Sequence, residues 1–240
     1  MTSISFVFED FNERSKEVSE YLTFINDLQK EKMKLITESQ ENSRPKKIDK
    51  GLEDTLKASA YLLLYNLIES TMRNAIEAIF DELKNQGVSF DQIRPELKKI
   101  VLDNLKQRNS DKITEKIKNI SLDIITIVFD KSVFEEGELL FGNEKLFSGN
   151  FDARKIKTVA KEYGFSSQTK TDSRDLLIVK TKRKDLAHGI KSFAEVGREK
   201  SVDELIKIQD KVVEYLRQIL ENIETYLDNQ DYLDSSTNTL

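Results

Sequence analysis

The sequence Tyr61-Leu-Leu-Leu-Tyr-Asn-Leu-Ile-Glu-Ser-Thr-Met-Arg-Asn-Ala-Ile76 forms the apolar centre of a helix that we predict over residues 51–85. Apolar residues recur along it at intervals of three and four, the spacing of one helix face. The stripe is broad, so we expect other helices to cover this one on more than one side. Its members are Leu56, Leu63, Leu64, Leu67, Ile68, Met72, Ala75, Ile76, Ile79 and Leu83.

Helical patterns extend along the chain on both sides of this segment. Gly87, Gly164 and Gly189 are placed to end helices, and Ser201 with Glu204 forms a capping box. Apolar periodicity and such signals predict further helices over residues 8–36, from 89 or 91 to 107, from 110 or 111 to 130, 152–163, from 172 or 173 to 188, and 201–227.

The segments between and after these helices have a different composition. Residues 38–50 are polar and contain Pro45, which is typical of a linker. Residues 131–150 contain three of the 8 glycines and predict one irregular insertion. We expect an all-α, up-and-down helical bundle over residues 51–228. An N-terminal amphipathic helix and linker precede it at 1–50, and a disordered acidic tail follows at 229–240.

The composition of the 240-residue chain excludes several kinds of site. The absence of Cys excludes disulfides, thiol nucleophiles and thiolate-bound zinc. The single His excludes a multi-His metal site within one chain. With 8 Gly and 2 Pro, the chain also has too few turn residues for an all-β protein. We therefore expect no metal and no cofactor.

The chain contains no candidate membrane helix or signal peptide. Its most apolar run, residues 61–68, is far shorter than the ~20 residues that span a bilayer. The first residues lack the basic and apolar regions of a signal peptide. These features predict a cytoplasmic protein without a membrane partner.

Charge is distributed unevenly along the chain. Residues 174–200 contain eight Lys or Arg and four Asp or Glu, a balance of +4, whereas the whole chain carries −5 and its remainder therefore −9. Such a basic segment could bind phosphates. An ordinary solvated helix face with mixed charges would have the same composition.

The only His of the chain lies in this basic segment, in Arg183-Lys-Asp-Leu-Ala-His188-Gly189. An Arg and a His separated by four residues form a weak pattern on their own. Positions i and i+5 of a regular helix point about 140° apart, so Arg183 and His188 converge only if both line a cleft or the helix loosens near Gly189. A His in the last helical turn would also simply complement the helix dipole.

The sequence around this motif resembles the HEPN superfamily of helical-bundle proteins. The motif follows the apolar residues 176–179, and three further blocks add to the resemblance, at residues 61–76, 148–165 and 193–198. Together they resemble one stand-alone subfamily of bacterial defence and toxin–antitoxin loci, over roughly residues 55–225. The resemblance implies a metal-independent endoribonuclease that acts as a toxin or antiviral effector.

The chemistry implied by the resemblance assigns roles to two residues. A ribose 2′-OH attacks the adjacent phosphate, leaving a 2′,3′-cyclic phosphate and a 5′-OH end. Imidazole, with an ordinary pKa of about 6.5, suits proton transfer, which is the role implied for His188. The guanidinium of Arg183 would bind the phosphate. Because each chain has one His, a His acid and a His base require a homodimer with a composite site across its two-fold axis.

Six residues are predicted to support catalysis or to bind RNA: Glu69, Arg73, Lys180, Lys182, Lys184 and Asp185. Lys184 stands where active members often have Asn, Asp or His, which puts rate and specificity in question. Glu69 and Arg73 could instead form an i,i+4 surface ion pair, and the lysines could be solvated. Tyr61 and Tyr65 are interpreted as core or interface aromatics. A neighbouring antitoxin or defence protein is a further expected partner.

Two other functions remain open at this point. A non-catalytic HEPN-like module would scaffold or regulate a partner, or bind a nucleotide, and would cleave no RNA. A helical structural subunit that owes nothing to the motif would bury His188 in its core, away from any cleft or interface.

Overall fold

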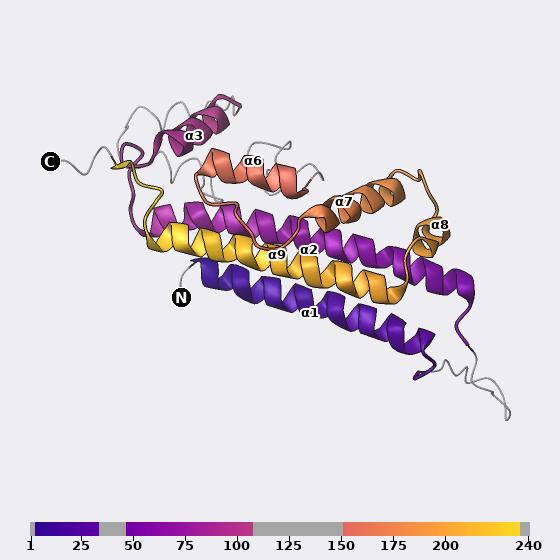
Figure 1. Cartoon of the computed structure of the whole chain (residues 1–240). Coiled ribbons are helices and arrows are strands. Elements are labelled where there is room, and N and C mark those ends of the chain that lie inside the picture. The colour runs from indigo at the N-terminus through magenta and orange to yellow at the C-terminus, as the bar shows by residue number, and fades with distance from the viewer. Residues whose placement is uncertain (1–2, 34–46, 108–150, 236–240) are drawn as a thin grey trace. The chain divides into compact units, whose positions relative to one another are not determined.

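The computed structural model describes residues 3–33, 47–107 and 151–235. The elements of secondary structure named within these ranges are all α-helices (Figure 1). The all-α prediction is therefore confirmed. The predicted helix over 110–130 and the irregular insertion over 131–150 lie outside the described residues. The helices are α1 (Ser3–Gln29), α2 (Lys50–Asn85), α3 (Pro95–Gln107), α6 (Ala153–Tyr163), α7 (Arg174–Ala187), α8 (Phe193–Arg198) and α9 (Val202–Asp228).

The boundaries of α1 differ most from the prediction. The helix begins at Ser3 and ends at Gln29, earlier than predicted at both ends. Glu31 adopts a left-handed conformation with φ 57°, which terminates the helix. The exposed side chain of Met33 continues the apolar spacing without belonging to the core. Apolar periodicity alone therefore extended this prediction past the real helix end.

Helix α3 begins at Pro95, because the residues before it form a turn. Neither Ser89 nor Asp91 caps the helix. The Ser89 amide and hydroxyl instead donate to the side-chain carbonyl of Gln92. The backbone amide of Arg94 donates to the carbonyl of Tyr232 at 2.9 Å.

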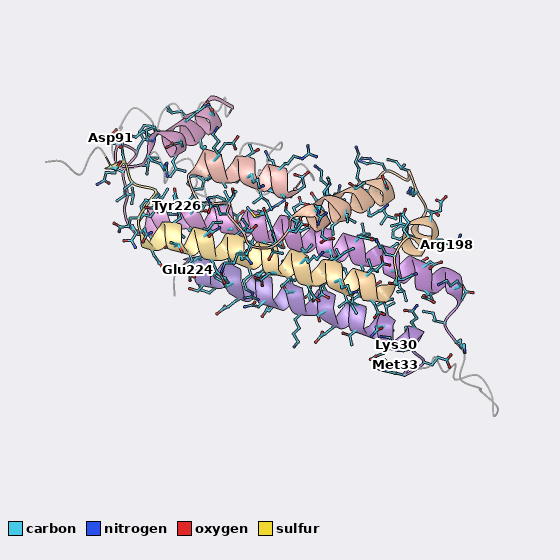
Figure 2. All side chains as sticks on the ribbon, in the orientation of Figure 1. Lys30, Met33, Asp91, Arg198, Glu224 and Tyr226 are labelled. Carbon is cyan, nitrogen blue, oxygen red and sulfur yellow. The ribbon has the colours of Figure 1, made fainter. Side chains whose placement is uncertain are left out.

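The described helices belong to two compact units, and α1, α2 and α9 each contribute to both. The first unit comprises Met1–Phe8, Thr71–Thr169 and Arg217–Leu240, as far as these ranges are described. Tyr226 on α9, labelled in Figure 2, organises its core by donating a hydrogen bond of 2.9 Å to the carbonyl of Tyr163 on α6. As predicted, α6 ends at Gly164, whose φ of 89° suits glycine.

The segment after α9 packs in this first unit, contrary to the expected disorder of residues 229–240. Tyr232 is 1% exposed, and its ring contacts the ring of Tyr226 with centroids 6.2 Å apart. The Asp234 amide also donates to the Gln92 carbonyl at 2.8 Å. The prediction was wrong for residues 229–235 because it weighed acidic composition above one buried aromatic side chain; residues 236–240 lie outside the described residues.

The second unit comprises Glu9–Ser70 and Lys170–Leu216, and it contains the Arg-x4-His motif. Its core includes most of the apolar stripe of α2 up to Ile68, with Tyr61, Leu64, Leu67 and Ile68 at most 1% exposed. The capping box of Ser201 and Glu204 is present at the start of α9. Sequence reasoning missed α8, although Ser192 and Glu195 form another capping box before it.

Candidate active site

Helix α7 carries the motif and is anchored in the second unit by its apolar side. Leu176, Val179 and Leu186 are buried, whereas Leu177 on the other side is 43% exposed. Before the helix, the carboxylate of Asp172 accepts a hydrogen bond from the backbone amide of Arg174 at 3.0 Å. The helix is therefore fixed at its start and along one face.

Helix α7 ends in a Schellman motif that places His188 at the C-cap position. The Ile190 amide donates to the Asp185 carbonyl at 2.9 Å, and the Gly189 amide donates to the Leu186 carbonyl at 3.2 Å. Gly189 has φ 64°, a conformation that side chains disfavour. We refer to residues 188–191 as the His188 turn.

The imidazole of His188 is exposed to solvent. Within the described part of the chain, it forms no side-chain hydrogen bond or ion pair. The alternative of a helical structural subunit predicted that His188 would be buried in the core. The exposed imidazole does not show this feature. The ring is available to a ligand or to another chain.

The guanidinium of Arg183 lies over the ring of Tyr65, with Cζ 4.8 Å from the ring centroid. Arg183 is partly buried and Tyr65 is 2% exposed, so a core aromatic of α2 supports the motif arginine. The prediction of Tyr65 as a core aromatic is confirmed. Its contact with Arg183 was missed, because no sequence pattern connects residues so far apart.

Within one chain, α7 directs Arg183 and His188 to different surroundings. The helix is regular through Ala187, and five positions turn it by about 140°. The left-handed residue, Gly189, comes after His188, so local loosening of the helix does not rotate the imidazole towards Arg183. Arg183 contacts the α2 ring while His188 faces solvent.

The lysines of the motif region differ in exposure and pairing. Lys182 is an ion-pair partner of Glu199, and its side chain is only 16% exposed. Lys184 is exposed, Asp185 is half-buried, and Lys180 is half-buried with polar contacts of its own. Lys184 is therefore the most accessible of the predicted phosphate-binding lysines.

Glu69 and Arg73 are both half-buried on α2 and both have interaction partners. Glu69 belongs to the same compact unit as the motif, whereas Arg73 belongs to the other unit. Their predicted roles in RNA binding remain predictions.

A buried ionic cluster holds α8 against α2 and was not found from the sequence. The Asp54 side chain is 0% exposed; it forms an ion pair with Lys57 at 3.0 Å and accepts a hydrogen bond from Arg198 at 3.1 Å. Burial raises the pKa of the Asp54 carboxyl, but its hydrogen bonds to Lys57 and Arg198 outweigh this, and the pKa is lowered overall. Arg198 is labelled at the end of α8 in Figure 2.

Gly197 allows α8 to approach the α2 backbone closely. A Cβ atom at this position would lie 1.9 Å from the carbonyl oxygen of Asp54. The ionic cluster and this close approach therefore fix the same two helices. The available signals in the sequence were charged Asp54 and Lys57 on an apolar helix, and a glycine beside Arg198.

The described residues contain no group of three or more His, Asp or Glu side chains that could hold a metal ion. In the same residues, no helix is both long and apolar enough to cross a membrane.

Comparisons with known proteins identify one family. The family model described as HEPN_MAE_28990-like HEPN matches residues 4–232. No curated protein and no solved structure matches the chain significantly. The match is wider than the resemblance over residues 55–225, since it also includes almost all of α1. Because it covers nearly the whole chain, including both compact units and the motif of α7, the chain belongs to the HEPN family.

Proposed function

We propose that this chain is a metal-independent endoribonuclease that cleaves RNA to 2′,3′-cyclic phosphate and 5′-OH ends. Membership of a family generally associated with ribonuclease activity supports the proposal. The observation that carries it is the state of the two motif residues. Arg183 is held on a buried ring, and His188 is presented to solvent by an ordered helix end.

The proposed roles follow from the chemistry of the two groups. Arg183 binds the scissile phosphate and stabilises the negative charge that develops in the transition state. The Tyr65 ring binds one face of the guanidinium, and its planar N–H edge remains suited to phosphate oxygens. His188 transfers a proton, either from the attacking 2′-OH or to the departing 5′-oxygen.

The complete site requires two chains in this proposal. Each chain contributes one His, and its Arg183 and His188 face different surroundings. A two-fold dimer can place the His188 of one protomer beside the Arg183 and His188 of its partner. The exposed apolar side chains of Ile190 (61%), within the His188 turn, and Phe193 (36%), shortly after it, would suit such an interface.

The proposed substrate contacts are weighted by accessibility. Exposed Lys184 is the first candidate for a phosphate contact, with Lys180 and Asp185 as supporting groups. Lys182 is a weaker candidate because its charge is paired with Glu199. We propose that the protein acts in the cytoplasm as a toxin or antiviral effector. An antitoxin or a neighbouring defence protein would hold it inactive.

One observation favours a second function, that of a non-catalytic interaction module. Arg183 and His188 do not meet on the described surface of one chain, so a chain that remains monomeric would lack a complete site. Sedimentation equilibrium of the purified protein discriminates between the two functions. A monomer at micromolar concentration that cleaves no RNA would favour the interaction module.

The experiment that tests the proposed nuclease is expression of wild type and His188→Ala in a bacterial host without neighbouring genes. Growth arrest and new 5′-OH ends in cellular RNA are expected from the wild type alone. The purified proteins are then incubated with total RNA in EDTA, where wild-type cleavage is expected to persist because the chemistry uses no metal. Equal cleavage by both proteins would contradict the role of His188.

A further inference from the structure

Glu199 connects the two sides of the His188 turn through one carboxylate. Its two oxygens contact the ammonium groups of Lys182 and Lys191, the latter at 2.8 Å. Lys182 directly precedes Arg183, and Lys191 is the last residue of the turn. The carboxylate therefore joins α7 just before the motif to the chain just after it.

The position of Glu199 is itself fixed by contacts with α2. Glu199 follows Arg198, which forms an ion pair with the buried carboxylate of Asp54. Two residues before it, Gly197 packs against the Asp54 backbone. Asp54 is further held by Lys57, whose side chain is 5% exposed. The carboxylate that joins the lysines thus extends from an anchored helix end.

The electrostatics favour a persistent connection. Glu199 is 31% exposed and Lys182 is 16% exposed, so both are partly shielded from solvent. The hydrogen bonds from Lys182 and Lys191 lower the pKa of the Glu199 carboxyl, because they stabilise its charged form. Two cations on one partly buried anion are held more firmly than an isolated surface pair.

We propose that Glu199 is a positioning residue that fixes the His188 turn relative to Arg183 for RNA cleavage. The inference rests on the proposed nuclease function, and it adds a residue that touches neither RNA nor the reacting atoms. It also gives Lys182 a role in positioning instead of phosphate binding. Both parts of the site are then anchored to α2. Arg183 is held by Tyr65, and the His188 turn is held by Glu199, whose helix is fixed to Asp54.

The first test follows the turn itself and needs no activity. The amides of Gly189 and Ile190 donate to α7 carbonyls, so their hydrogen exchange reports whether the turn is fixed. In Glu199→Ala, we expect both amides to exchange at least tenfold faster than in wild type. The matched control is Glu20→Ala, which removes one carboxylate from the exposed ion pair of Lys16 and Glu20 on α1. Exchange in the control should be unchanged.

The second test separates positioning from binding and folding. In Glu199→Ala, kcat for RNA cleavage should fall at least tenfold, while KM stays within threefold and the thermal unfolding midpoint stays close to that of Glu20→Ala. Lys182→Ala should lower kcat in the same way and add little in the double variant, since both changes break one connection. If Glu199→Ala is poorly folded, Lys191→Ala provides a second variant. It removes only the ion pair between Glu199 and Lys191, the more exposed of the two lysines, and should by itself accelerate hydrogen exchange of the Gly189 and Ile190 amides.

The outcomes distinguish this inference from the proposed nuclease function. Unchanged turn exchange in folded Glu199→Ala would overturn the inference, whether or not the wild type cleaves RNA. If the wild type does cleave RNA, an unchanged kcat in Glu199→Ala would overturn the inference as well. A wild type that cleaves no RNA, together with faster turn exchange in the variant, would instead overturn the nuclease and retain Glu199 as the residue that fixes the turn.

Discussion

The guanidinium of Arg183 lies 4.8 Å from the centroid of the Tyr65 ring, and no carboxylate in the described residues pairs with it. A ring face attracts the cation without neutralising its charge. A carboxylate in the same place would compete with phosphate for the N–H donors. The contact therefore holds an arginine in place while leaving it competent to bind an anion.

Replacing the Tyr65 ring should impair cleavage according to what remains of its face. Tyr65→Leu removes the aromatic face, and we expect catalytic efficiency to fall by up to about thirtyfold, since a desolvated contact of this kind contributes up to ~2 kcal/mol. Tyr65→Phe keeps the face and should stay within about threefold of wild type. Steady-state cleavage of a short RNA measures both, and equal losses in the two variants would contradict the role of the ring.

A glycine pair separates helix-end stability from function. Gly189 and Gly87 both end helices, with φ of 64° and 63°, and a Cβ atom added at either position would meet no other group within 4 Å. Gly189→Ala and Gly87→Ala should each destabilise the fold by ~1–2 kcal/mol in urea unfolding, because the backbone conformation disfavours a side chain. Only Gly189→Ala should also reduce cleavage, since it alone alters the His188 turn. Equal activity in the two variants would show that the turn geometry is unimportant.

The helix ends and apolar faces could be predicted from the sequence because their causes are local. Gly164 and the pair of Ser201 and Glu204 end or begin helices where the chain signals it. The segment after α9, by contrast, is held by residues far away in the sequence: the Arg94 amide donates to the Tyr232 carbonyl, and the Asp234 amide donates to the Gln92 carbonyl. Short-range rules could not reveal such a contact.

The residues of the candidate site also fall into those that could be predicted from the sequence and those that could not. The motif of Arg183 and His188 and the neighbouring lysines could be read directly from the sequence. Tyr65, Asp54 and Glu199 could not, because each acts on a residue of another helix. Their roles depend on how α2, α7 and α8 pack, and periodicity gives no information on that packing.

Replacing Lys184, in the motif, and Lys182, directly before it, should change the salt dependence of RNA binding differently. Lys184 is exposed, so Lys184→Ala should weaken RNA binding and reduce the slope of log K against log salt by ~0.7–1, as expected for one lost phosphate contact. Lys182 is paired with Glu199, so Lys182→Ala should leave this slope unchanged. Fluorescence anisotropy with a labelled RNA between low and moderate salt measures the slope. The same slope for both variants would argue against this division of roles.

The buried cluster of α2 should make stability depend on acidic pH. The folded state lowers the pKa of Asp54 below its usual 3.8, so the unfolded chain binds this proton at a higher pH than the folded chain. The stabilisation is therefore complete above about pH 4 and is lost as pH falls through the lowered pKa. Asp54→Asn should cost ~3 kcal/mol at neutral pH, because it leaves the buried Lys57 without its closest anion.

The control for this prediction is the shape of the pH profile. The difference in unfolding free energy between wild type and Asp54→Asn should become smaller below pH 4, where the Asp54 carboxyl of the wild type becomes protonated. Urea titrations at several pH values measure it. A difference that is constant from pH 7 to pH 3 would mean that the Asp54 charge does not stabilise the fold.

The most direct test of the account is the identity of the RNA ends produced by purified wild type and His188→Ala in EDTA. Because His188 is the only imidazole of the chain, the variant removes every His acid or base from both protomers of a dimer. We expect 2′,3′-cyclic phosphate and 5′-OH ends from the wild type, and at least a hundredfold slower cleavage by the variant, in the range of lost general acid–base catalysis. Ends bearing 5′-phosphate, or equal cleavage by the two proteins, would contradict this expectation.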